Sequence, residues 1–198
     1  AADAAANDYF GYSVAIDGAT IVIGAYGDDD GGSTSGSAYV YRTSDDGATY
    51  AQVTKLTASD AATWDYFGIS VAIDGGTIVV GADDDDDGGT DSGSAYIFRT
   101  DDGGATYGQV AKLTASDAAA GGRFGSSVAL DGGPIVLGAR LDNVAGTNLG
   151  SAYVFRTTDG GATYGQVAKL TASDAAANDY FGRSVAISAG IIAIGAMG

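Results

Sequence analysis

The chain has 198 residues, and its charge is one-sided: all 25 acidic residues are aspartate, and nine lysines and arginines leave a net charge of −16. This charge excludes a general nucleic-acid or anionic-membrane surface, which needs clustered positive charge. The chain has no cysteine and no histidine, so disulfides and thiolate metal sites are excluded and the commonest general base is missing.

The first residues show strand patterns. Phe10 to Ile16 and Thr20 to Ala25 are short apolar segments joined by Asp17-Gly18, a strong signal for a two-residue hairpin turn. A third strand is predicted over Ser37 to Thr43, and a fourth, more polar one over Tyr50 to Thr57. No segment has a sustained apolar period of 3.6 residues, and no apolar run approaches the ~20 residues of a membrane span. We therefore predict an all-β chain without membrane insertion.

The same pattern returns every 57 residues without insertion. The repeats cover about residues 1–57, 58–114 and 115–171, followed by a partial repeat over 172–198. Each copy opens its first hairpin with a Phe-Gly pair and closes it with a Gly-Ala pair. The Phe-Gly-Gly sets are Phe10, Gly11 and Gly24; Phe67, Gly68 and Gly81; Phe124, Gly125 and Gly138; and Phe181, Gly182 and Gly195. The chain is therefore expected to hold three four-stranded units and one further hairpin.

Four antiparallel strands per repeat predict one sheet, and a series of such sheets around an axis is a β-propeller. The apolar first two strands suit the inner positions of a blade, and the polar fourth strand suits its rim. A β-solenoid is the competing architecture, but its coils are usually shorter and its strands parallel. A ring needs typically four to eight blades. We expect that the chain is part of a longer one or that another copy completes it, because an unpaired apolar edge invites association.

Four motifs together resemble the FG-GAP repeat of the integrin α-subunit propeller and its relatives. They are Phe10-Gly11, Ser13 to Ile16, Ile21 to Ala25 and Gly36 to Val40, and they recur along the whole chain. The resemblance implies a propeller, usually seven-bladed, on an extracellular or cell-surface protein with an adhesive or scaffolding role. The calcium loop that some integrin blades carry between the first two strands is absent here, because Asp17-Gly18 is too short to wrap an ion.

A second motif, Thr-x-Asp-x-Gly-x-Thr-Tyr, fills the turn between the third and fourth strands. It resembles the Asp box of sialidase-type propellers, where it is a folding device, and its aspartates here are Asp45, Asp102 and Asp159. A sialidase-like glycosidase is the remote alternative that this likeness raises. Arg42, Arg99 and Arg156 hold one equivalent position per repeat, however, and should point away from one another. With glutamate and histidine both absent, we predict no catalytic residues and no enzyme.

The acidic loops between the second and third strands are the candidate metal site. Carboxylates and glycine-permitted carbonyls suit Ca²⁺, which takes six to eight oxygen ligands. The candidate ligands are Asp28, Asp29, Asp30, Asp83, Asp85 and Asp87. A run of aspartates is also the ordinary composition of a solvated loop, so both interpretations stay open.

The loops before each first strand hold the other candidate. Trp64, the single tryptophan, lies beside Asp65, and an exposed tryptophan here would contact a sugar or a protein; the alternative is packing between blades. We predict a non-enzymatic extracellular adhesion or scaffold module that acts through its loops and self-assembly. Its partners would be other proteins, further copies of itself or carbohydrate. The alternative is a calcium- or mineral-binding acidic repeat protein.

Overall fold

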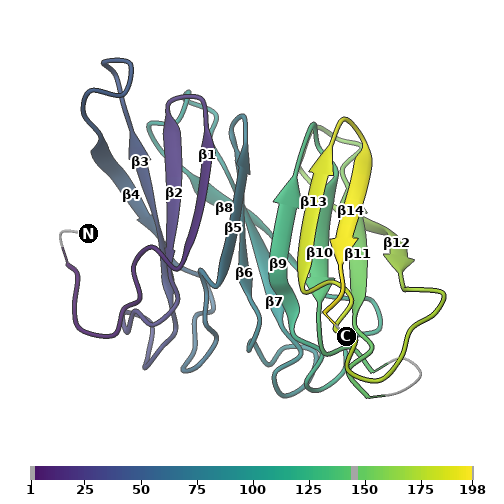
Figure 1. Ribbon diagram of the computed structural model, residues 1–198. Coiled ribbons are helices and arrows are strands. Elements are labelled where there is room, and N and C mark those ends of the chain that lie inside the picture. Colours follow the sequence, from purple (N-terminus) through teal and green to yellow (C-terminus); the bar gives the residue numbers. More distant parts are fainter. Residues whose placement is uncertain (1–2, 144–146, 198) are drawn as a thin grey trace.

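A computed structural model describes residues 3–143 and 147–197 and contains only strands, turns and loops there (Figure 1). No helix in these residues has the length and apolar character that a membrane span requires. The strands are β1 (Ser13–Asp17), β2 (Thr20–Ala25), β3 (Ser37–Arg42), β4 (Ala51–Leu56), β5 (Ser70–Asp74), β6 (Thr77–Ala82), β7 (Ser94–Arg99), β8 (Gly108–Leu113), β9 (Phe124–Leu130), β10 (Ile135–Ala139), β11 (Ser151–Arg156), β12 (Gly165–Leu170), β13 (Ser184–Ser188) and β14 (Ile191–Gly195).

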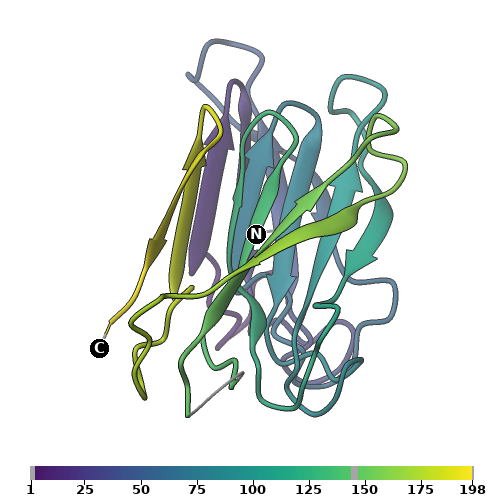
Figure 2. The same cartoon turned by 90° about the vertical axis from the view of Figure 1, so that its right-hand side faces the viewer.

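The strands form four antiparallel sheets in chain order, with strand orders β1-β2-β3-β4, β5-β6-β7-β8, β9-β10-β11-β12 and β13-β14. Figure 1 shows them fanned side by side, and in Figure 2 the C-terminal hairpin (yellow) lies at the left-hand edge of the molecule. Its strand β13 contacts β9 and β10 of the third sheet. In the described residues the sheets do not close into a ring. The architecture is nevertheless that of a β-propeller, with three complete blades and one hairpin, and the sequence prediction is confirmed.

One predicted boundary is wrong by three residues, whereas the other boundaries predicted in the first repeat differ by at most one residue. The first strand was expected from Phe10, but β1 begins at Ser13, because Tyr9 and Gly11 have φ angles of 54° and 91° and Tyr12 N donates to Tyr9 O at 3.1 Å. The turn from Tyr9 to Tyr12 precedes Ser13, the first residue that pairs with β2. Only β9 begins at its phenylalanine, Phe124.

Each sheet has two different apolar faces. The large-residue face of the second sheet, made of Phe67, Val71, Ile73, Ile78, Val80, Tyr96 and Phe98, packs on the small-residue face of the first, made of Ala15, Val22, Ala38, Val40 and Leu56. The same arrangement recurs between the second and third sheets. Large residues on one sheet thus pack against small residues on the next, as close packing of a protein interior requires.

Close backbone approach ties neighbouring sheets together. Ser13 Oγ donates to the carbonyl of Gly68 at 2.7 Å, and Ser70 and Ser127 repeat this bond to Gly125 and Gly182. A Cβ added at Gly24 would lie 2.0 Å from the same Gly68 oxygen, so only glycine fits there. The Gly-Ala and Phe-Gly motifs are therefore the two sides of one sheet-to-sheet contact.

The turns between third and fourth strands are stabilised from within. Asp45 accepts hydrogen bonds from Thr49 N at 2.8 Å, Thr49 Oγ1 at 2.6 Å and Thr43 Oγ1 at 2.7 Å. These bonds, that of the Thr49 hydroxyl first, lower the pKa of Asp45 to about 2. Arg42 donates to the carbonyl of Gly103 in the next turn at 2.5 Å, and Arg99 makes the same bond to Gly160. These arginines link sheets, so the structural interpretation of their pattern is confirmed.

Candidate functional site

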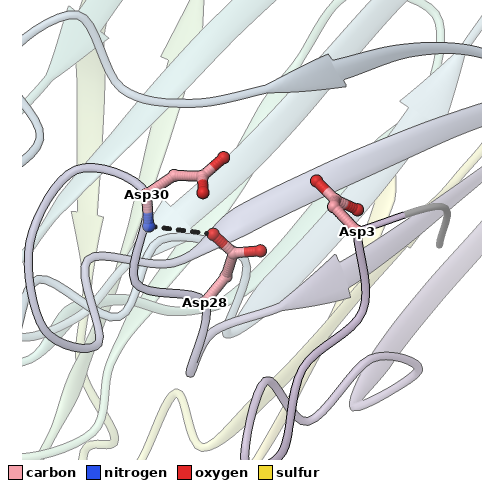
Figure 3. Close-up of side chains that lie close together, drawn as sticks. All are labelled: Asp3, Asp28 and Asp30. Carbon is pink, nitrogen blue, oxygen red and sulfur yellow. Dashed lines mark hydrogen bonds between the residues drawn. The ribbon is translucent and has the colours of Figure 1, made fainter.

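Three carboxylates converge where the loop after β2 meets the loop before β1. Ligand atoms of Asp3, Asp28 and Asp30, the first acidic cluster, lie within 4.8 Å of one another (Figure 3). Asp60, Asp85 and Asp87 form an equivalent second acidic cluster. In each cluster the middle aspartate is buried, with Asp28 and Asp85 both 4% exposed.

A lysine lies at the centre of each cluster. Lys55 Nζ on β4 lies 2.8 Å from Asp3, 2.9 Å from Asp28 and 2.5 Å from Asp30. Lys112 makes the same three contacts to Asp60, Asp85 and Asp87 at 2.8, 2.9 and 2.5 Å. Because Ca²⁺ binds oxygen at about 2.3–2.6 Å, the ammonium takes the place that a cation would hold.

Strand pairing positions this lysine. Lys55 pairs directly with Tyr39 of β3, and its Nζ lies 5.2 Å from the centre of the Tyr39 ring. The Tyr39 hydroxyl donates to Asp28 at 2.9 Å. Burial raises the pKa of Asp28, but the hydrogen bond from Lys55 and those from its other neighbours together hold it below its usual range. The cluster is thus a hydrogen-bonded network of three aspartates around one lysine, and the lysine offsets only part of their charge.

The structure brings together four of the six predicted metal ligands, Asp28, Asp30, Asp85 and Asp87. Asp29 lies outside and accepts a bond from Thr34 N at 2.7 Å, while Asp83 pairs with Arg140 at 2.9 Å. Asp3 and Asp60, which complete the clusters, were missed. The recurrence of aspartate every 57 residues in the leading loops was the available signal.

The two predicted binding residues, Trp64 and Asp65, lie in different environments. Trp64 is 56% exposed, so the alternative that it packs between blades is wrong. Asp65 is 5% exposed and accepts a bond from Ala62 N at 2.6 Å. Burial raises the pKa of Asp65 to about 6. Asp65 therefore supports its own loop, and only Trp64 is available to a partner.

Trp64 is held in an unfavourable backbone conformation. Its φ is 74°, in the left-handed region, and the equivalent residues Asn7, Gly121 and Asn178 have φ angles of 73°, 78° and 69°. Asparagine and glycine tolerate this region, whereas a bulky residue there is an outlier. The backbone thus gives no reason for tryptophan at this position.

Aromatic rings continue from Trp64 along the ends of the inner strands. Trp64 and Tyr66 lie 6.4 Å apart, Tyr66 and Tyr26 5.4 Å, and Tyr26 contacts both Tyr12 at 4.6 Å and Tyr9 at 4.9 Å, measured between ring centres. We call these five residues the aromatic row. The sequence does not reveal this row, because its members come from the loops of two sheets.

The aromatic row borders a cavity of about 610 Å³ that contains three arginines, Arg123, Arg140 and Arg183. Arg140 pairs with Asp83, which is 2% exposed, and Arg123 contacts Asp84. Burial raises the pKa of Asp83 despite the guanidinium groups of Arg140 and Arg123. An arginine cluster therefore does form in this chain, but from residues other than Arg42, Arg99 and Arg156.

Comparison with protein families gives one match, to a model described as the FG-GAP repeat, over residues 1–41, 50–98, 107–155 and 164–198. Comparison with curated proteins gave no match. Among solved structures, the crystal structure of Saccharomyces cerevisiae Sqt1 is similar with a TM-score of 0.54 at 11% identity. That match covers 86% of this chain and 38% of Sqt1, and at such low identity it supports the fold alone.

Proposed function

The chain belongs to the FG-GAP repeat family, and from that premise we propose that it is a non-enzymatic extracellular adhesion or scaffold module. Repeats of this family form β-propeller modules that are typically non-catalytic and usually extracellular or on the cell surface. The proposed module works through the loop end of its sheets and by assembling with further copies of itself. One observation carries the assembly: the large-residue face of the first sheet is open to solvent.

The exposed face of the first sheet has the same residue types as the face of the second sheet that is buried against its neighbour. Val14 and Ile16 are 60% and 64% exposed, whereas their equivalents Val71 and Ile73 are 9% and 8% exposed. Full burial of such a side chain stabilises by roughly 1.5–3 kcal/mol. A small-residue face placed on the first sheet would therefore gain the contacts that already join the sheets within the chain.

A second copy has the complementary face at its C-terminal hairpin. Ala186 and Ala193 of β13–β14 are exposed, and they occupy the positions of Ala15 and Val22 in the first sheet's small-residue face. We infer head-to-tail association of β1–β4 of one copy with β13–β14 of another.

The test is the oligomeric state in solution. Sedimentation and light scattering should show a concentration-dependent dimer, and Ile16→Asp should reduce it to a monomer with unchanged circular dichroism. Val167→Asp, on the 57% exposed surface of β12, is the matched control and should still dimerise. A monomer at every concentration, or a dimer that survives Ile16→Asp, would overturn the assembly. The non-enzymatic part predicts no turnover of a fluorogenic sialoside and hexoside panel.

The convergence of three carboxylates favours a second candidate, a calcium- or mineral-binding acidic repeat protein. In this candidate Ca²⁺ displaces Lys55 and Lys112 from the acidic clusters. Calorimetry with Ca²⁺ on the unaltered chain and on Lys55→Met tests it directly. Binding to the unaltered chain, lost when Asp28 and Asp30 become asparagine, supports the candidate. Binding to the lysine variant alone would show that the ammonium replaces the ion in the native protein and would end the candidate.

A further inference from the structure

The cavity beside the aromatic row is built from very few places in the repeat. Numbering each repeat from its first residue, so that Phe10, Phe67, Phe124 and Phe181 all hold position 10, its ten lining residues come from positions 9, 12, 26 and 27 alone. These positions lie just before the first strand of each repeat, or within the start of β9 for Ser126, and just after the second strand. Loops of all four sheets therefore meet at one point.

The repeats differ from one another most at this point. Positions 12 and 26 are the only ones that hold a different residue in each of four copies: Tyr12, Ile69, Ser126 and Arg183, and Tyr26, Asp83, Arg140 and Met197. Positions that join the sheets, in contrast, are the same in all copies. Packing between sheets requires similar residues at the same position of every copy. A set of unlike residues gathered in one cavity therefore indicates an asymmetric ligand.

The charges in the cavity are mixed. Three of the chain's nine cationic residues lie here although the net charge is −16. Arg140 and Arg123 are occupied by Asp83 and Asp84, whereas none of the ion pairs between described residues includes Arg183. The cavity thus offers acceptors, donors and one guanidinium with no acidic partner.

The apolar side of the cavity consists of tyrosine rings. Tyr12 is 60% exposed and lies edge-on to Tyr26, which in turn lies edge-on to Tyr66. Trp64 extends the row outward. Amphipathic rings with one wet face bind ligands that combine apolar C–H surface with hydroxyl groups.

We propose that this cavity binds a carboxylated saccharide, such as a uronic-acid unit of an acidic polysaccharide. Sugar hydroxyls both donate and accept, so they suit the paired aspartates and arginines. The carboxylate of the ligand binds Arg183, because the planar guanidinium group can donate two parallel hydrogen bonds to it. An acidic peptide fits less well, because it lacks the series of hydroxyl groups that the paired aspartates and arginines would bind. A volume of about 610 Å³ accommodates such a ligand.

The experiment is calorimetric titration with tri-galacturonic acid and with its neutral methyl ester. The acid should give saturable binding, and the ester should bind about tenfold more weakly, because it lacks the charged carboxylate that Arg183 would bind. Arg183→Ser and Tyr12→Ser should each weaken the acid by about tenfold or more. Each variant places a serine at position 12, where the third repeat already has Ser126, so the fold should tolerate both substitutions.

Arg156→Ser is the control, because Arg156 is exposed on β11 and does not line the cavity. It should leave affinity unchanged. The net charge of −16 opposes general attraction of a polyanion, so saturable binding requires a local site. No binding of the acid, equal binding of acid and ester, or equal loss in Arg156→Ser and Arg183→Ser would each overturn the proposal. None of these outcomes depends on the oligomeric state.

Discussion

The first and second sheets have almost the same sequence and opposite surroundings. Strands β1 and β5 share the pentapeptide Ser-Val-Ala-Ile-Asp, yet the valine and isoleucine are exposed in β1 and buried in β5. Gly68 is enclosed by the first sheet, whereas a Cβ at Gly11 would meet nothing within 4 Å. In this molecule, the stability that a residue contributes is therefore set by the neighbouring sheet rather than by local sequence.

The largest expected effect compares the two phenylalanines. Phe67 is 0% exposed and Phe10 is 39% exposed. Phe67→Ala should lower the free energy of unfolding by about 3–5 kcal/mol, because it leaves a cavity between sheets. Phe10→Ala should cost about 1 kcal/mol or less at low protein concentration. Urea denaturation measures both, and equal losses would show that the first sheet is covered in solution.

The two Phe-Gly glycines provide the next comparison. A Cβ at Gly68 would lie 2.3 Å from the Ser37 carbonyl oxygen, and both Gly68 and Gly11 have positive φ angles, 94° and 91°. Gly11→Ala should cost about 1–2 kcal/mol for the left-handed backbone alone. Gly68→Ala adds steric overlap and should cost about 2–4 kcal/mol. Thermal unfolding of the two variants would contradict the packing described if Gly11→Ala were the less stable one.

A smaller effect appears as pH dependence in the loop before the second sheet. The folded pKa of Asp65 is raised to about 6 by burial, so its favourable contribution is complete below pH ~4 and is lost as pH rises through 6. Asp65→Asn should remove this loss, on the order of 2 kcal/mol between pH 4 and 7.

Asp45 in the first sheet's turn is the matched control with the opposite sign. Its folded pKa is lowered to about 2, so its contribution is present above pH ~4 and is lost as pH falls toward 2. Melting temperatures of Asp65→Asn and Asp45→Asn should therefore diverge from those of the unaltered chain in separate pH windows. Identical pH profiles for both variants would rule out the burial argument for Asp65.

The smallest predicted effect is a gain. Trp64→Asn should raise the free energy of unfolding by about 1 kcal/mol, since asparagine tolerates the left-handed backbone that tryptophan disfavours. The reciprocal Asn7→Trp, at an exposed site of the first sheet with φ of 73°, should lower it by a similar amount. A loss of stability in Trp64→Asn would mean that Trp64 serves packing instead of binding.

Much of the fold was predictable because the hairpin and turn signals are local and recur every 57 residues. The difference between Val14 and Val71 was not, because identical pentapeptides contain no information about the next sheet. Lys55 was also missed as a partner of the acidic loops. Its place follows from its pairing with Tyr39 across β3 and β4, a register that includes an irregularity between Val40 and Tyr41.

The cavity was the least predictable feature, since it requires that positions far apart in sequence meet at one point. A signal was nevertheless present in the differences between copies. Tyr12 and Arg183 occupy the same position of otherwise similar repeats. The differences between copies at positions 12 and 26 therefore indicate, from the sequence alone, which residues line the cavity. In a chain of repeats, positions with the same residue in every copy indicate the architecture. Positions with different residues indicate where the copies differ in function.

The lysines in the acidic loops have a further consequence for where such a module can work. Lys55, Lys112 and Lys169 contact aspartates in three successive repeats, so the counter-ion of each loop is a lysine side chain on the fourth strand of the same sheet. Unlike a bound metal ion, a covalently attached ammonium is not removed by a chelator or by dilution. We therefore expect loops held in this way to form together with the fold, without an added metal ion.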